Sequence, residues 1–510
     1  MSCGLILGNL LTPQETPVAT GGQSKYKKLQ DIIDVLDHKY VDNIDDEELF
    51  EQSIADMLHK LDPHSNYIAA RDLKSINEDI EGKFGGVGIR FFIIKDTICV
   101  TNVVPNSPSE RVGLKAGDKI IRVDGKPVAG QKITNDEIMG MLKGHEGTKV
   151  KLVIFRNGKT INKVVVRGTI PVESVTASYM ITDEIGYIKI ERFSVVTANE
   201  FREASYKLRQ DGLKKLIIDV RNNGGGVLTS ATDIVDEFMN ANIPIVETRG
   251  EHSQKKVYRS TANGSLKGID LAVLINSNSA SASEILAGAI QDNDRGTIVG
   301  RRSFGKGLVQ EDVLLRDGSN LRLTVARYYT PTGRCIQKPY NGDMEDYYND
   351  QMDRYDNGEL YHIDTSLFVD SLKFTTPKGK TVYGGGGIMP DVFVPFDSSG
   401  TSWYLTQLRY SPAFTTFAFD YIQGKRDNWE SPNEFARKFN VTDAIVTRFV
   451  NFAKTQHDVS IDPMGLATSR ELIKKHIKGE IARQIWVEQG YYQVTNLTDK
   501  EVLKAIELFR

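Results

Sequence analysis

Between residues 170 and 395 of the 510-residue chain, short apolar runs alternate with amphipathic helical segments. The apolar runs are IGYIKI, KKLIIDV, DLAVLI and GTIVG, and their length and composition are typical of strands. Helical patterns follow in TANEFREASYKLRQDG, LTSATDIVDEFMN and ASEILAGAIQD. Because strands that alternate with helices form layered sheets, this region predicts an α/β core.

The regions on either side have different patterns. Residues 24–81 repeat apolar positions every three or four residues until DPHS interrupts them, which predicts helices. Next comes a β-rich module of some eighty residues, with strands predicted at 89–94, 98–104 and 119–123 between Gly, Pro and Asp-Gly turns. The aromatic and acidic stretch YNGDMEDYYNDQMDRYDNGELYH is interpreted as a surface insertion, and the last hundred residues as mainly amphipathic helices.

Composition excludes several classes of protein. Apolar content of 40% and charged content of 26% are ordinary for a soluble globular protein. A net charge of -3 with no strongly basic domain argues against a general nucleic-acid binder. The cysteines Cys3, Cys99 and Cys335 are far apart, so they give neither a disulfide framework nor a zinc spacing. Cys99 lies in an apolar run and is expected to fill the core.

The N-terminal run CGLILGNLL is apolar but far shorter than the ~20 residues that a membrane-spanning helix needs. No basic region precedes it. The run fits the remnant of an export signal or membrane anchor, and supports export without establishing it.

Small residues crowd the start of one predicted helix, in NSNSASASEILAGAIQDNDRG. Ser281 and Glu284 fit the S-x-x-E capping box, which needs no enzymatic role. Alternatively, a serine on a strand-to-helix turn can be a nucleophile, provided that a base activates it. Small neighbours would leave room for a substrate backbone beside it.

The candidate base is a lysine. The eight histidines are scattered, and none lies in a recognisable triad context. Lys306 lies between two glycines in GRRSFGKGLVQ. A free lysine, with a pKa near ~10.4, is protonated at neutral pH. Burial lowers that pKa, and Arg301 and Arg302 could add positive potential. A solvated loop lysine is the alternative that spacing alone favours.

Three glycine-rich segments carry weaker signals. Residues 300–306 match G-x-x-x-x-G-K, but Gly307 stands where a phosphate-binding loop needs Ser or Thr, which argues against nucleotide binding. The amides of NNGGG, at the start of a helix, could form an oxyanion hole. The loop GKFGGVGIRF could bind a peptide C-terminal carboxylate while the peptide adds as a strand. Plain turns would explain the last two equally well.

Taken together, these segments resemble the carboxyl-terminal processing proteases, a serine–lysine family with a PDZ domain. The resemblance rests on SASASEILAGAIQD, FGKGLVQ, DVRNNGGG, LDPHS and SPSERVGLKAGDKIIRVDGKPV, and covers roughly residues 29–395. It implies a multidomain α+β protein with a crotonase- or ClpP-like α/β core. The expected divisions are an apolar, flexible tail (1–23), a helical domain (24–82), the PDZ domain (83–168), the protease core (169–397) and a C-terminal helical extension (398–510).

The resemblance also implies roles for single residues. Ser281 matches the nucleophile, Lys306 the general base and Gln310 the residue that orients the base. Lys306 and Gln310 would share one face of a strand, so the amide oxygen could accept from the amine. The remaining matches are Asp292 as a supporting acid, the amides of Gly226 and Ala282 as the oxyanion hole, and Gly85, Gly86, Val87, Gly88 and Ile89 as the peptide-carboxylate loop.

These matches imply a serine endopeptidase that cleaves proteins near their C-termini, without a metal or cofactor. Its partners would be flexible or unfolded C-terminal tails and no nucleic acid, and the terminal helices are candidates for adaptor or homo-oligomer contacts. Family members usually work in the cell envelope or periplasm, so we expect such a location, with anchoring through the N-terminal segment. Alternatives are a catalytically inactive PDZ-containing peptide-binding scaffold and a crotonase-like enzyme, which would leave Lys306 unused.

Two positions depart from the family pattern. Arg301 and Arg302 stand where many relatives carry an acidic residue, and Lys143 stands where relatives often have Arg. If position 143 senses the docked tail, its coupling to the active site is in doubt.

Overall fold

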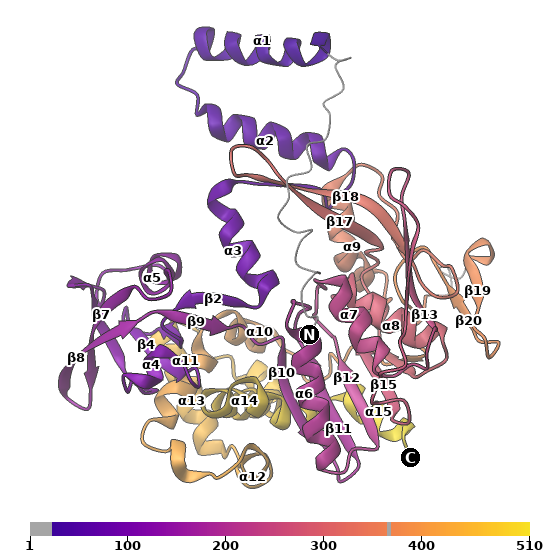
Figure 1. Cartoon of the computed structure of the whole chain (residues 1–510). Helices are drawn as coiled ribbons and strands as arrows, with labels where there is room; N and C mark the ends of the chain where they lie inside the picture. Colours follow the sequence, from indigo (N-terminus) through magenta and orange to yellow (C-terminus); the bar gives the residue numbers. More distant parts are fainter. Residues whose placement is uncertain (1–22, 365–368) are drawn as a thin grey trace, which may run out of the picture.

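The computed structural model describes residues 23–364 and 369–510, and Figure 1 shows their arrangement. Two helices, α1 (Gln23–Lys39) and α2 (Asp46–His59), stand out from the rest of the molecule. The apolar run CGLILGNLL and the tail predicted for 1–23 fall almost wholly outside the described residues. In the described part of the chain, no helix is both long and apolar enough to cross a membrane.

The predicted α/β core is present and contains a six-stranded sheet of order β10-β11-β12-β15-β16-β21. The five strands β11, β12, β15, β16 and β21 run parallel to one another, and β10 is antiparallel to β11. The strands are β10 (Val175–Met180), β11 (Ile185–Ile190), β12 (Lys215–Asp219), β15 (Asp270–Ile275), β16 (Thr297–Gly300) and β21 (Val392–Phe393).

Helices cover both faces of this sheet. Leu216 and Ile218 of β12 pack into the cluster that contains α6 (Thr197–Gln210), α7 (Leu228–Asp236) and α8 (Ala282–Asp292). Ile217 packs on the other face against α15 (Lys500–Leu508). Strands that are buried on both faces need apolar residues throughout, which explains the continuous apolar runs in the sequence. The last helix of the C-terminal extension is therefore part of the α/β core.

A second sheet brings the DPHS turn to the candidate site. Its long strand β18 (Asn320–Tyr329) pairs with β1 (Asn66–Ile68), β13 (Pro244–Arg249) and β17 (Leu308–Leu314). Strand β14 (Lys256–Arg259) extends the sheet beyond β13. Since β1 and β17 both lie on β18, residues just before β1 can contact residues at the start of β17.

Helix α3 (Ala70–Glu81) connects β1 to the β-rich module. The module contains β2 (Lys83–Gly86), β3 (Ile89–Ile93), β4 (Ile98–Val103), α4 (Pro108–Arg111), β5 (Lys119–Val123), β6 (Lys126–Pro127), α5 (Asn135–Leu142), β7 (Lys149–Arg156), β8 (Lys159–Val166) and β9 (Gly168–Pro171). It has a core of its own, and Cys99 is buried at its edge, as predicted.

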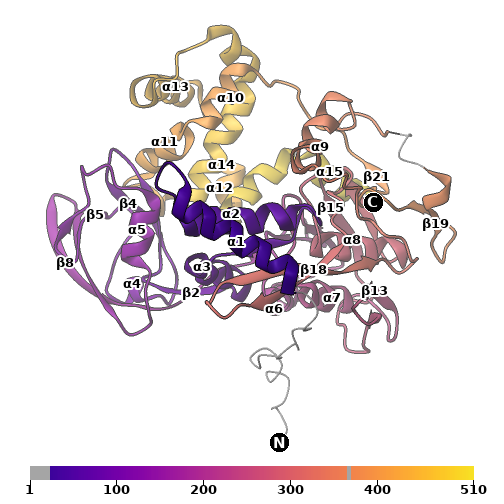
Figure 2. The ribbon, with the colours of Figure 1, turned by 90° about the horizontal axis from the view of Figure 1, so that it is seen from above.

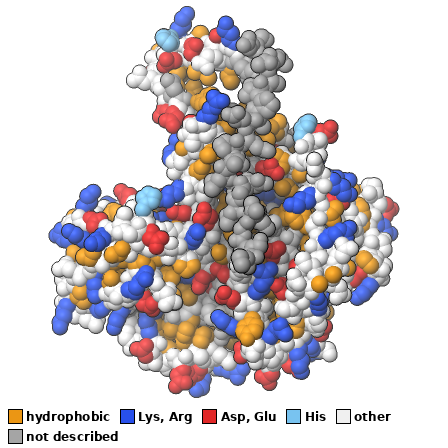
Figure 3. Space-filling view, viewed as in Figure 1, with side chains coloured by type: hydrophobic (Ala, Val, Ile, Leu, Met, Phe, Trp, Pro, Cys, Tyr) orange, Lys and Arg blue, Asp and Glu red, His pale blue; other side chains and the backbone are white. Residues whose placement is uncertain are grey.

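The C-terminal helices lie beside this module in Figures 1 and 2, and below α3 in the view of Figure 1. They are α10 (Trp403–Tyr410), α11 (Ala413–Ile422), α12 (Pro432–Lys438), α13 (Asp443–His457) and α14 (Pro463–Thr495), and they share an aromatic-rich core. Helix α14 kinks at Trp486 and Val487 and then reaches the core sheet, where Gln489 bonds both backbone groups of Ser178. Acidic and basic side chains are interspersed over the face in Figure 3.

The aromatic and acidic stretch is not merely a surface insertion, which corrects the sequence interpretation. It contains α9 (Met344–Asp356), in which Tyr347 and Arg354 are buried. Arg354 donates to the carbonyl oxygens of Arg302 and Ser303 at 3.2 and 2.9 Å. A neighbouring hairpin is formed by β19 (Lys373–Thr375) and β20 (Thr381–Tyr383). Helix α9 thus supports the segment that leads to Lys306.

Candidate active site

Ser281 lies between β15 and α8 in a strained conformation, with φ 56° and ψ −113°. Few residues other than glycine adopt a positive φ, and such strain is often found at functional sites. Ser279 Oγ donates to Val220 O at 2.8 Å, and Ser283 Oγ donates to Asn223 O at 2.9 Å. Among the described residues, by contrast, the Ser281 side chain makes no capping hydrogen bond. Of the three serines, Ser281 is the one whose hydroxyl remains available.

Glu284 joins the Ser281 turn to the Lys306 segment. Its buried carboxylate accepts the amide of Ser281 at 2.8 Å and, on the same oxygen, the amide of Lys306 at 2.9 Å. The other oxygen accepts the amide of Gly305 at 2.7 Å and Ser303 Oγ at 2.5 Å. Burial raises the pKa of Glu284 to about 7, and the four donors oppose that rise. The capping-box pattern had revealed only the bond to Ser281.

Lys306 has the environment of a potential base. Its Nζ donates to Gln310 Oε1 at 3.0 Å, and Gln310 in turn donates to the carbonyl oxygen of His64. Burial, followed by the nearby cation Arg322, lowers the pKa of Lys306 to about 8, against the opposing charges of Asp62 and Glu284. Lys306 precedes β17, so the predicted shared strand face is wrong even though the predicted contact forms.

The source of the positive potential was also predicted wrongly. Arg301 binds Glu501, and Arg302 forms an ion pair with Glu359 at 2.6 Å. Arg322 instead extends from β18, which pairs with β17. The effective cation is thus set by strand pairing, whereas sequence proximity had suggested the two adjacent arginines.

The Ser281 hydroxyl and the Lys306 amine are not hydrogen-bonded to each other in the described part of this structure. Lys306 Nζ donates instead to Gln310. Catalytic hydrogen bonds are often long in enzymes without substrate, so this arrangement is compatible with catalysis.

The glycine turn after β12 lies against Ser281. A Cβ added to Gly225 would lie 2.7 Å from Ser281 Cβ, and Gly225 has φ +102°. Asn223 fixes this turn, because its side-chain oxygen accepts the amide of Gly225 at 2.8 Å and its carbonyl oxygen accepts the amide of Ala280 at 3.0 Å. The predicted oxyanion donors are close to this contact: Gly226 follows Gly225, and Ala282 begins α8. Neither amide donates a hydrogen bond to another described residue.

Asp292 lies at the opposite end of α8 from Ser281. It is fully buried and binds Arg334 at 2.7 Å and Thr332 Oγ1 at 2.7 Å. Asp292 therefore anchors the C-terminal end of α8, whereas Ser281 lies at the N-terminal end of the same helix.

Sequence reasoning did not predict that the DPHS turn contacts Gln310 of the candidate site. Asp62 accepts the amides of His64 and Ser65 at 2.8 Å, and Thr324 Oγ1 at 3.0 Å. The buried ring of His64 bonds Tyr347 OH at 3.0 Å, while its carbonyl oxygen faces Gln310. Burial, together with the positive charge of Lys306, lowers the pKa of His64 to about 3, so its ring is neutral. The sequence signal for this contact was the LDPHS motif, one of the segments on which the family resemblance rests.

The predicted carboxylate loop is shorter than its glycines suggested. Gly85 and Gly86 end β2 and pair with β9, and Ile89 begins β3. Only Val87 and Gly88 lie between the strands, with their carbonyl oxygens bound to the amides of Ser109 and Val104 at 2.9 and 3.1 Å. In the described chain the amides of Val87 and Gly88 have no partner, so they are available for a ligand.

The departure at position 143 has a structural counterpart. Lys143 Nζ binds Glu78 of α3 at 2.6 Å and lies 4.6 Å from the ring centre of Phe84. This lysine therefore links the β-rich module to the helix that connects it with the core.

Several parts of the chain match known protein families. Residues 184–346 match Peptidase family S41, residues 85–165 match a PDZ domain, and residues 10–71 match the N-terminal domain of the activating protease CtpB. Residues 404–487 match a family of unknown function. These matches place the chain in the class of serine-type peptidases that carry a PDZ domain.

The relatives narrow the class. The chain is 38% identical over 340 residues to a carboxy-terminal-processing protease of Bartonella bacilliformis, covering 64% of this chain and 77% of that protein. A probable CtpA-like serine protease of Staphylococcus saprophyticus is 33% identical, over 62% of this chain and 64% of its own length. A solved photosystem II D1 C-terminal processing protease is 29% identical, with a TM-score of 0.35 over 61% of this chain and 83% of that one. The chain belongs to the carboxy-terminal-processing proteases of family S41.

Proposed function

We propose that this chain is an endopeptidase in which Ser281 is the nucleophile and Lys306 the general base. The main support for this proposal is the partly buried Lys306 amine, whose lowered pKa of about 8 leaves part of it unprotonated near neutral pH. Glu284 holds the backbones of both residues on one carboxylate oxygen. Gln310 accepts from the amine and would orient it.

In this proposal the unprotonated Lys306 amine takes the hydroxyl proton as Ser281 Oγ attacks the substrate carbonyl carbon. The amides of Gly226 and Ala282 would stabilise the oxyanion. Lys306 then returns the proton to the leaving amine, and water hydrolyses the acyl-enzyme. The Asp292–Arg334 pair would contribute by holding α8 in place.

We propose in addition that the PDZ domain binds the C-terminal tails of protein substrates. The free amides of Val87 and Gly88 support carboxylate binding there. The divisions at residues 23, 82, 168 and 397 remain our proposed domain boundaries, with α15 returning to the core. Because members of the family usually work in the cell envelope, we also propose that this chain acts there.

The nucleophile is tested by three matched variants. Ser281→Ala should reduce peptide cleavage by on the order of a million-fold, as expected for loss of a nucleophile. Ser279→Ala and Ser283→Ala remove hydroxyls that are bound to carbonyl oxygens, so they should weaken stability and leave substantial turnover. Labelling by a fluorophosphonate probe, located by mass spectrometry, identifies the reactive serine. Labelling at another serine, or an active Ser281→Ala variant, would refute the assignment.

A further inference from the structure

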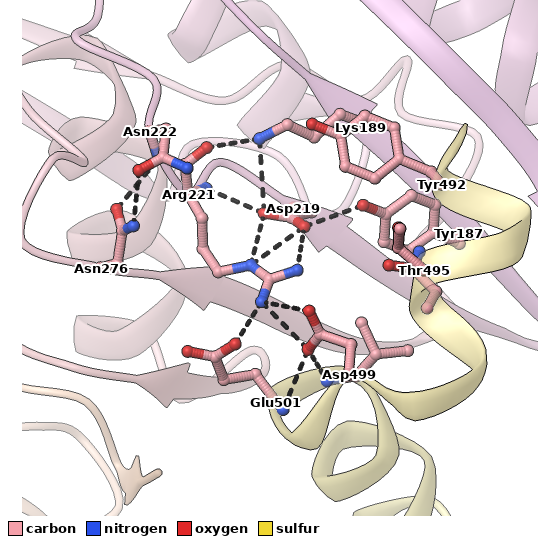
Figure 4. Close-up of polar contacts among 12 residues, drawn as sticks. Tyr187, Lys189, Asp219, Arg221, Asn222, Asn276, Tyr492, Thr495, Asp499 and Glu501 are labelled. Atoms are coloured by element: carbon pink, nitrogen blue, oxygen red, sulfur yellow. Dashed lines mark hydrogen bonds and ion pairs between the residues drawn. The ribbon is translucent and has the colours of Figure 1, made fainter. Parts of the chain in front are cut away.

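Helix α15 presents two acidic residues to the core. Asp499 caps the helix, because one of its carboxylate oxygens accepts the amides of Glu501 and Val502 at 3.0 Å. Both oxygens of Asp499 also lie 3.0 Å from Arg221 Nη1 (Figure 4). The same carboxylate therefore fixes the start of α15 and binds the core.

Glu501 binds two arginines at once. One carboxylate oxygen binds Arg221, and the other accepts from Arg301 Nη1 at 2.5 Å. Arg221 follows β12 and Arg301 follows β16, which are the two neighbours of β15 in the sheet. A single carboxylate thus joins the ends of the two strands that flank the strand leading to Ser281.

Arg221 precedes the turn that contacts the nucleophile. Its neighbour Asn222 exchanges two hydrogen bonds with Asn276, at 2.9 and 2.8 Å (Figure 4). Gly225, four residues after Arg221, approaches Ser281 so closely that it has no room for a side chain. A shift of Arg221 would therefore be transmitted to the proposed oxyanion turn.

Arg301 begins the segment that leads to Lys306. Its amide donates to Ile275 O at 3.2 Å, at the end of β15. Three residues later, the amide of Phe304 donates to Ser279 O at 3.0 Å. Residues 301–304 are therefore hydrogen-bonded at both ends to residues 275–279, which lead to Ser281.

The cluster is largely buried, and its ion pairs join equal numbers of cations and anions. The side chains of Arg221 and Glu501 are 11% and 10% exposed. The cations are Lys189, Arg221 and Arg301, and the anions are Asp219, Asp499 and Glu501. Loss of one carboxylate would leave a dehydrated guanidinium without its partner, which is strongly unfavourable. The docking of α15 is thus coupled to the placement of both arginines.

We propose that Asp499 and Glu501 are positioning residues of the protease site. They hold Arg221 and Arg301, and through them the oxyanion turn and the Lys306 segment. This inference rests on the proposed function of Ser281 and Lys306. It gives the end of the C-terminal extension a role in catalysis: full turnover requires a docked α15.

The first test uses Glu501→Gln in the full chain, which removes the charge and keeps the shape. We expect kcat for an unstructured peptide to fall by about tenfold or more, while KM changes by less than about twofold, because the chemical step depends on the affected turns. The control is Glu507→Gln on the same helix, since Glu507 is exposed and pairs with Lys504. That control should keep the parental kcat.

The second test separates positioning from stability. Arg301→Gln/Glu501→Gln removes one charge of each sign, so its thermal midpoint should exceed that of Glu501→Gln. We expect kcat per folded molecule to stay low in this charge-balanced variant. If Glu501→Gln does not fold, the double variant still tests the proposal. Recovery of kcat together with the thermal midpoint would overturn the proposal, as would an unchanged kcat in Glu501→Gln. An active Ser281→Ala variant would instead overturn the proposed function itself.

Discussion

The protonation state of one amine controls activity in the proposed reaction. The folded pKa of Lys306 is about 8, below the ordinary value of 10.5, chiefly because the partly buried side chain is desolvated. As a base it works only after losing its proton. We therefore expect kcat/KM to rise about tenfold from pH 6 to pH 7 and to level off above the pKa, as for a single deprotonation. A profile that is flat between pH 6 and 9 would contradict this role.

Substitution of Lys306 distinguishes a base from a fixed charge. Lys306→Arg keeps the charge but does not lose its proton, so it should be almost as inactive as Lys306→Ala when peptide cleavage is measured. Near-parental activity in Lys306→Arg would mean that the residue acts only through its charge. Gln310→Ala removes the acceptor at 3.0 Å and leaves the amine, so its loss of kcat should be smaller.

At the scale of structural elements, the glycine turn after β12 is expected to tolerate side chains unequally. A Cβ on Gly225 would lie 2.7 Å from both Ala280 O and Ser281 Cβ, at a φ of +102° that disfavours alanine. Gly225→Ala should therefore lower kcat by about a hundredfold or more, since small displacements of a catalytic group have effects of that size. The kcat of the purified variant checks this prediction.

The adjacent glycine provides the control. A Cβ on Gly224 would meet no atom within 4 Å, so Gly224→Ala should keep most of its turnover. Circular dichroism and thermal melting of both variants separate a local effect from unfolding. Equal kcat values for Gly224→Ala and Gly225→Ala would show that close approach to Ser281 is not what requires glycine.

At the scale of the whole molecule, selection of substrates is expected to depend on the PDZ domain. If the amides of Val87 and Gly88 bind a terminal carboxylate, amidation of a peptide's C-terminus removes the charge that they bind. Charge-assisted hydrogen bonds are about twice as strong as neutral ones, so kcat/KM should fall clearly, by about tenfold. The measurement compares one unstructured peptide with free and amidated termini.

A loop variant completes this comparison. Gly88 has φ +81°, and a Cβ there would lie 2.3 Å from Ser107 Cβ, so Gly88→Ala should distort the loop and treat both peptides alike. The control Gly140→Ala, at an open position of α5, should preserve the preference. If the unmodified protein cleaves both peptides equally, tail recognition is refuted while the Ser281 assignment stands.

Local patterns in the sequence were enough to predict the α/β core, the β-rich module and the C-terminal helices. Each depends on apolar periodicity and turn residues within a few positions of one another, and short-range sterics decide such features. The SASAS, NNGGG and FGKG segments likewise indicated the candidate site, because each holds its residues on one turn. The roles of Ser281, Lys306 and Gln310 came from the resemblance of these segments to the family, and they remain predictions.

Packing between distant segments decided the rest. The cation beside Lys306 is Arg322 because β17 pairs with β18, and α9 is partly buried because Arg354 finds carbonyl oxygens near residue 302. Glu501 meets Arg301 across 200 positions of sequence. Burial and ion pairing depend on which surfaces meet in space, and periodicity within one segment carries no record of that. The lowered pKa of Lys306 and the return of α15 to the core therefore followed only from the tertiary structure.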